Sequence, residues 1–125
     1  WNTYNINNIS LFSNCKSLTE VKIPMGITSI GEYAFQGCTS WTELEINSDN
    51  TTFKVEDNIL YSYDGKTIVK VPVGREGTIT IGNSVNEIGY MAFAGCTKLK
   101  KVHLPDHEID IAENAFEGTP WENEQ

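Results

Sequence analysis

The stretch IGEYAFQGC, from Ile30 to Cys38, decides the fold because the chain repeats it. It returns as IGYMAFAGC from Ile88 to Cys96, and more weakly as LFSNC from Leu11 to Cys15 and IAENAFEGT from Ile111 to Thr119. A phrase that recurs in register is typical of a repeat architecture. The phrase is therefore interpreted as scaffold rather than as a reactive site.

The spacing of equivalent residues gives the period of the repeat. Cys15 and Cys38 are 23 residues apart, and so are Phe93 and Phe116. From Phe35 to Phe93 the step is 58, which corresponds to one unit of 23 residues and one enlarged unit of 35. Units of this size bury their apolar side only by stacking, so the period predicts a solenoid with a continuous core.

Each unit reads as a strand, a loop and a short helix. Residues 21–23, Val-Lys-Ile, alternate between apolar and polar side chains, which is the period of a strand. Residues 30–35 have apolar side chains four apart, which predicts one inward-facing helical turn. Gly37 and Gly95 stand where such a turn needs a left-handed stop. One phenylalanine from each unit is expected in a stacked column: Phe12, Phe35, Phe93 and Phe116.

The enlarged unit contains a predicted β-hairpin at about residues 53–72. Asp64-Gly65 is a strong two-residue turn signal between β-prone flanks. Only a few residues separate this segment from the next strand at Ile79, which is too short for another coil. We therefore expect an insertion that projects from the stack, followed by a flexible return loop at residues 74–77.

Size and charge limit the function. A chain of 125 residues predicts a single domain, 1–125. The net charge of -8 and the pI near 4.6 disfavour nucleic acids and anionic membrane surfaces as partners. No apolar run approaches the roughly 20 residues of a transmembrane helix. No signal peptide is visible, and the chain begins in polar sequence inside an incomplete repeat. We therefore expect a processed chain or an excised fragment.

The sequence resembles a known family. IPMGITSIGEYAFQGCTSWTELEI and GNSVNEIGYMAFAGCTKLKKVHLP resemble the BspA-type leucine-rich repeat, and NILYSYDGKTIVKVP resembles the insertion that recurs in it. The likeness covers residues 11–119. It implies an α/β repeat fold, namely a right-handed leucine-rich-repeat solenoid of about four to five 23-residue coils with a β-hairpin insertion. A C-terminal cap is expected at about 119–125, where Pro120 can begin a short helix.

The resemblance also implies a function. The family occurs in surface or secreted proteins of host-associated bacteria and of some protozoa, and its members are associated with adhesion to host or matrix proteins. It implies a non-catalytic protein-binding module at the cell surface or in secreted form, with no catalytic residues to carry over. The alternatives are a carbohydrate-binding accessory module of a larger secreted protein and a spacer.

The three cysteines share one position of the repeat. Cys15, Cys38 and Cys96 occupy it in three units, and Thr119 fills it in a fourth. A position that accepts cysteine or threonine favours a small inward side chain, so a buried ladder is the main interpretation. A disulfide between Cys15 and Cys38 is the alternative, and a catalytic thiol is the least supported reading.

Other motifs carry little chemistry. Residues 65–67, Gly-Lys-Thr, resemble the tail of a phosphate-binding loop but lack its earlier glycine, so they are interpreted as a hairpin turn. The cluster of Asp106, His107, Glu108 and Asp110 lacks zinc or calcium spacing and is interpreted as a polar loop, with a weak cation site as the alternative. Two glycosylation sequons begin at Asn8 and Asn50. Neither an enzyme, a cofactor nor a metal is predicted.

The outward side chains of the strands form the candidate protein-binding face. They fall in two rows, which are Lys22, Glu45, Thr80 and His103, and Glu20, Glu43, Thr78 and Lys101. Tyr61 and Tyr63 of the hairpin are a second candidate, because tyrosine is favoured at interfaces. The alternative is that the charged rows are only solvated cross-strand pairs.

Overall fold

The computed structural model describes residues 15–31, 35 and 37–121. Phe12 of the expected phenylalanine column, the sequon at Asn8 and most of the expected cap lie outside these ranges. Over the described residues the chain forms nine β-strands. They are β1 (Glu20–Ile23), β2 (Glu43–Ile46), β3 (Phe53–Glu56), β4 (Ile59–Ser62), β5 (Thr67–Lys70), β6 (Gly77–Thr80), β7 (Glu87–Ile88), β8 (Leu99–His103) and β9 (Asp110–Ile111).

The strands confirm the 23-residue period. β1 pairs in parallel with β2, and β6 in parallel with β8. Val21 lies opposite Leu44 and Ile79 lies opposite Val102, so equivalent residues of successive units are neighbours. β7 and β9 follow the same rule with Ile88 opposite Ile111. The result is a solenoid of about four turns.

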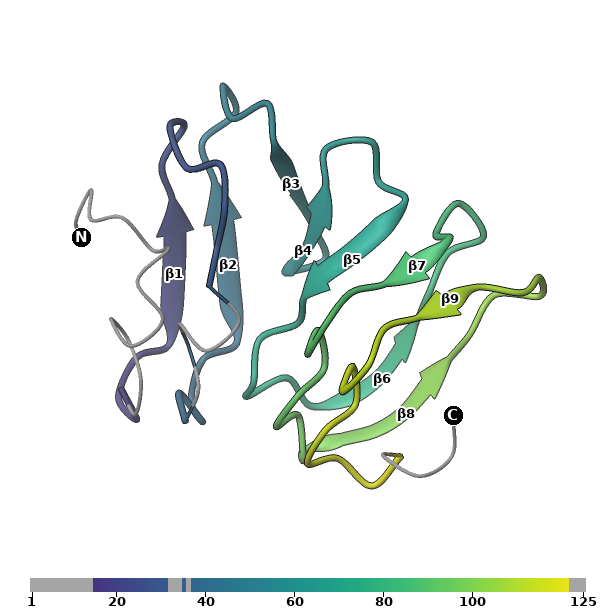
Figure 1. Ribbon diagram of the computed structural model, residues 1–125. Coiled ribbons are helices and arrows are strands. Elements are labelled where there is room, and N and C mark those ends of the chain that lie inside the picture. The colour runs from purple at the N-terminus through teal and green to yellow at the C-terminus, as the bar shows by residue number, and fades with distance from the viewer. Residues whose placement is uncertain (1–14, 32–34, 36, 122–125) are drawn as a thin grey trace.

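A second sheet has the order β3-β4-β5-β7-β9. Its first three strands pair antiparallel, and β5, β7 and β9 pair in parallel. The residues of β4 and β5 therefore form a hairpin, but it does not project from the stack. The prediction of a projecting insertion is wrong because β5 continues into the solenoid through its pairing with β7. Figure 1 shows β3, β4 and β5 between the strand pairs β1–β2 and β6–β8.

The turns of this segment differ from the predicted one. The two-residue turn is Asp57-Asn58, where both residues have positive φ (53° and 60°), as a type I′ hairpin requires. The Asn58 side chain also accepts a hydrogen bond from the Leu44 N–H at 2.9 Å, which links the β3–β4 hairpin to β2. Asp64-Gly65 does form a turn, but inside a longer loop between β4 and β5. There the Asp64 carboxylate accepts hydrogen bonds from the Ser62 hydroxyl and a backbone N–H.

The expected helix is absent from the described residues. In the second copy of the phrase, residues 88–96, the chain makes isolated turns instead. Met91 has a φ of 55°, and Asn114, 23 residues later, has a φ of 59°. A left-handed residue in the middle of the phrase interrupts any right-handed helical turn. The α/β label is therefore wrong for the described part of the chain, although Gly37 and Gly95 do adopt the predicted left-handed conformation.

The core consists of two clusters. One contains Phe35 and Trp41, whose ring centroids lie 4.5 Å apart, and the other contains Phe93 and Phe116, whose rings stack at 4.9 Å. The predicted phenylalanine column is interrupted between these pairs. Val71 donates its N–H to Ala92 O just as Phe93 donates to Ala115 O, so Val71 holds the phenylalanine position in the enlarged unit.

The return loop after β5 is held, whereas the sequence predicted a flexible loop. The N–H of Gly74 donates to Trp41 O at 2.7 Å. Arg75 donates from Nη1 to Asp57 O at 2.6 Å and from Nη2 to the Asp57 carboxylate at 2.8 Å. The loop therefore connects the turn before β2 with the turn of the β3–β4 hairpin, and it joins the two core clusters.

Candidate binding face

The structure divides the candidate face into two parts. β1 pairs with β2 and β6 with β8, but β2 and β6 belong to different sheets. The eight predicted residues consequently lie on two surfaces. The β1–β2 half-face carries Glu20, Lys22, Glu43 and Glu45, and the β6–β8 half-face carries Thr78, Thr80, Lys101 and His103. All of them are exposed except Glu20, which is half-buried.

The β1–β2 half-face is acidic. Its one lysine, Lys22, forms an ion pair with Glu45 at 3.8 Å, with both side chains more than half exposed (57 % and 63 %). Exposed pairs of this kind contribute about 0–1 kcal/mol to stability. Glu20 lies directly opposite Glu43, and like charges in that position repel. The charges here are thus mostly solvated or already paired.

The β6–β8 half-face is cationic and rich in hydroxyls. Thr78 lies opposite Lys101 and Thr80 opposite His103. The pairing register shifts between Gly77 and Thr78, and both Lys100 and Lys101 are exposed on β8. Sequence reasoning missed Lys100, although two successive lysines in Leu-Lys-Lys-Val break the strand alternation and signal a bulge. Among the described residues neither lysine takes part in an ion pair.

The two hairpin tyrosines have different environments. Tyr61 is half-buried and packs against the core cluster that contains Phe93. Burial, followed by the negative charges of Glu56 and Asp57, raises the pKa of its phenol. Tyr63 is 57 % exposed, and its N–H donates to Thr52 O. Of the two, Tyr63 is the side chain that a partner can reach.

The cysteines line the interior, as the ladder interpretation predicted. Cys38 and Cys96 are fully buried, Cys15 is half-buried, and none of the three is in a disulfide. Burial raises the pKa of Cys38, and it raises that of Cys96 to about 12. Thr119, the fourth member, is buried and donates its hydroxyl to Phe116 O at 2.7 Å. A nucleophilic thiol needs a lowered pKa, so these environments oppose that chemistry.

The acidic cluster after β8 is a loop organised around His107. Its Nε2 lies 2.8 Å from Asn83 O, and its Nδ1 lies 3.0 Å from Glu108 O. Both neighbours are carbonyl acceptors, so only a protonated ring can donate to both. Asn83 belongs to the preceding coil, which makes His107 a bridge between two loops. Across the described residues no group of three or more His, Cys, Asp or Glu is placed to hold a metal ion.

We expect His107 to titrate above its value in the unfolded chain. The Glu108 carbonyl, the Asn83 carbonyl and then the Asp106 charge raise the pKa of the ring. The bridge therefore adds stability that is fully present below the unfolded pKa and is lost as pH rises through the folded pKa. NMR titration of the folded chain and of the chain in urea measures both values. A folded midpoint at or below the unfolded one would contradict the bridge.

Asn50 is a structural residue that sequence reasoning missed. It is 2 % exposed, and its side chain makes four hydrogen bonds. Its Nδ2 donates to Pro24 O and Ile27 O at 3.1 and 3.0 Å, and its Oδ1 accepts from the N–H groups of Thr52 and Phe53 at 2.8 and 2.9 Å. The sequon nitrogen is thus occupied in the folded chain. The available signal in the sequence was that Asn50, a polar residue, lies 23 positions after the apolar Ile27 and so takes the equivalent position in the next repeat.

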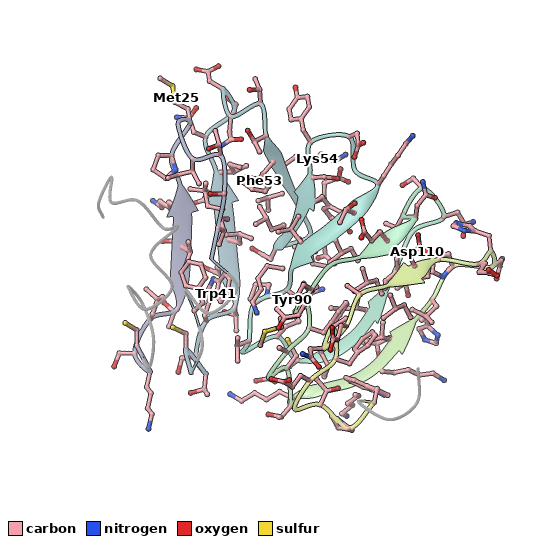
Figure 2. All side chains as sticks on the ribbon, viewed as in Figure 1. Met25, Trp41, Phe53, Lys54, Tyr90 and Asp110 are labelled. Atoms are coloured by element: carbon pink, nitrogen blue, oxygen red, sulfur yellow. The ribbon has the colours of Figure 1, made fainter. Side chains whose placement is uncertain are left out.

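One pocket lies over the second sheet. It has a volume of about 220 Å³, and its wall includes Val69 and Lys70 of β5 and Tyr90 in the turn after β7. Figure 2 shows Tyr90 near the middle of the molecule. The Lys70 amine donates to Met91 O at 3.1 Å, and burial lowers its pKa. None of the predicted strand-face residues lines this pocket.

These coils, in which equivalent strands of successive repeats pair in parallel, place the protein among the leucine-rich-repeat solenoids. The chain belongs to the BspA type leucine rich repeat family, whose model matches residues 2–72 and 76–124 in six copies. This confirms the family resemblance seen in the sequence. No curated protein matches the chain. Among the described residues, no helix has the length and apolar character needed to cross a membrane.

Solved structures share the fold. A leucine-rich repeat protein from Eubacterium ventriosum matches with a TM-score of 0.74 and 22 % identity over 82 % of this chain. A leucine rich cell surface protein from Faecalibacterium prausnitzii gives 0.66 and 32 % over 79 %, and the pneumococcal vaccine antigen PcpA gives 0.67 and 21 % over 75 %. The matched regions span 28 %, 27 % and 24 % of those chains, respectively, so this chain corresponds to about a quarter of each.

Proposed function

We propose that the chain is a non-catalytic protein-binding module of a cell-surface or secreted protein, and that its role is adhesion to a host or extracellular-matrix protein. The observation that carries this proposal is the pair of strand half-faces. Their polar side chains face solvent, while the alternate side chains of the same strands are buried in the core. Seven of the eight predicted residues are exposed. A solenoid supplies an extended surface of this kind for many modest contacts.

The comparisons support the proposal at a coarser level. Leucine-rich repeats are generally non-catalytic modules, and one structural neighbour is described as a cell surface protein and another as a vaccine antigen. The raised thiol pKa values also fit a scaffold better than an enzyme. A carbohydrate-binding accessory module is the second candidate. Tyr63, exposed in the loop after β4, is the observation that favours it, since sugars stack on aromatic rings.

A binding screen with half-face variants tests this function. The full chain is measured against immobilised matrix proteins and glycans, beside Lys22→Glu/Glu45→Lys, Thr80→Glu/His103→Glu and Tyr63→Ser. We expect a matrix protein to bind and one half-face variant to weaken that binding about tenfold or more, because interface energy concentrates in few residues. Glycan binding that only Tyr63→Ser removes would support the accessory module. No binding on the whole panel would contradict adhesion and support a spacer.

A further inference from the structure

We infer that the β6–β8 half-face is the protein-binding half, and that its partner is an extended acidic polypeptide segment. This inference rests on the proposed function and assigns it to one surface and one partner chemistry. The half-face consists of Lys100, Lys101 and His103 on β8 together with the hydroxyls of Thr78 and Thr80 on β6. It differs in sign from the molecule as a whole, whose net charge is -8.

Charge separation between the two half-faces is the first argument. The β1–β2 half-face has three glutamates and a lysine that is already paired with Glu45. On the β6–β8 half-face, Lys100 and Lys101 are exposed and have no ion pair among the described residues. At physiological salt a charge acts over about 8 Å, so a carboxylate that contacts Lys100 and Lys101 is attracted mainly by these two charges. An acidic partner is thus directed to the β6–β8 half-face.

The spacing of the side chains on the β6–β8 half-face indicates an extended partner. Lys101 and His103 are two residues apart on β8, which places their side chains on one side at a spacing of about 7 Å. An extended peptide with acidic residues at alternate positions has the same spacing. Thr78 and Thr80 lie opposite these two residues and offer hydroxyls that can donate to carboxylates. Only two lysines carry full charge here, which suits a short acidic segment better than a densely sulfated polysaccharide.

A peptide titration with matched lysine variants tests the inference. The probe is a labelled (Glu-Thr)5 peptide, with (Lys-Thr)5 and a heparin oligosaccharide as comparisons, measured by fluorescence anisotropy. We expect the full chain to bind (Glu-Thr)5 and not (Lys-Thr)5, and Lys100→Ala/Lys101→Ala to weaken binding roughly tenfold. Lys16→Ala/Lys66→Ala removes two exposed lysines elsewhere and should bind like the unmodified chain. Equal melting temperatures of the two variants show that both remain folded.

Each contrary outcome overturns the inference in a recognisable way. If (Glu-Thr)5 does not bind, or if both lysine variants lose affinity equally, the β6–β8 half-face is rejected as a specific site. Binding of heparin alone replaces the acidic polypeptide by a sulfated polysaccharide. A matrix protein from the screen that still binds Lys100→Ala/Lys101→Ala leaves the proposed function standing and rejects this half-face. The two hypotheses therefore fail separately.

Discussion

Replacing Asn50 by aspartate is expected to lower the free energy of unfolding by about 3–5 kcal/mol, the range for an uncompensated buried charge. The substitution keeps the shape and the oxygen that accepts from Thr52 and Phe53. It turns the amide nitrogen into a carboxylate oxygen that faces the carbonyl oxygens of Pro24 and Ile27. Two donated hydrogen bonds become two repulsive contacts in a site that is 2 % exposed.

Urea denaturation at neutral and acidic pH measures this effect. Repulsion and burial raise the pKa of the new carboxyl in the folded state, so the loss of stability should shrink as pH falls and the acid is protonated. Asn47→Asp is the matched control, because the Asn47 side chain is exposed in the same loop and its Oδ1 accepts a hydrogen bond from the N–H of Asp49, which a carboxylate also accepts. A loss below about 1 kcal/mol in Asn50→Asp, or an equal loss in the control, would reject Asn50 as the connection between the first two coils.

Alanine at Gly74 is expected to destabilise the chain by about 3 kcal/mol or more. A β-carbon there would lie 2.7 Å from Trp41 O and 2.8 Å from Thr39 O. Both atoms belong to the backbone of the turn before β2, so a side-chain rotation cannot relieve the contact. Relief requires the return loop to move away, which breaks the Gly74 hydrogen bond to Trp41 and disturbs packing between the two clusters.

Gly82→Ala is the control for this prediction. Nothing lies within 4 Å of a β-carbon built at Gly82, and its φ is not in the left-handed range, so we expect a change within about 0.5 kcal/mol. Thermal or urea unfolding of both variants gives the comparison. Similar stabilities for the two variants would show that the return loop is free to move and that the two clusters do not depend on it.

The repeat made much of the fold predictable. Residues 23 apart obey one pattern, and that pattern sets which residues pair, so Val21 and Leu44 face each other as the sequence indicates. The local conformation of the repeated phrase was not predictable in the same way. A four-residue apolar spacing is satisfied by a helix and equally by successive turns, and only the positive φ of Met91 and Asn114 separates the two.

The candidate face was predictable residue by residue but not as a surface. Alternation correctly assigns residues such as Lys22 and Thr80 to the solvent side of their strands. Whether the rows are continuous depends on where the 35-residue unit places its extra strands, and no local pattern contains that information. Asn50 was missed for a related reason, because its acceptors lie 23 and 26 residues earlier on another coil.

The hairpin between the two strand pairs has a geometric consequence. Figure 1 shows β6 and β8 running at a slant to β1 and β2, on the far side of β3 and β4. Units of equal length repeat the same step from coil to coil, whereas the enlarged unit here separates two strand pairs that run in different directions. In an array with several such units, their spacing along the sequence would fix the contour of the whole. Large-scale shape would then be encoded by where the long repeats occur rather than by the repeat consensus.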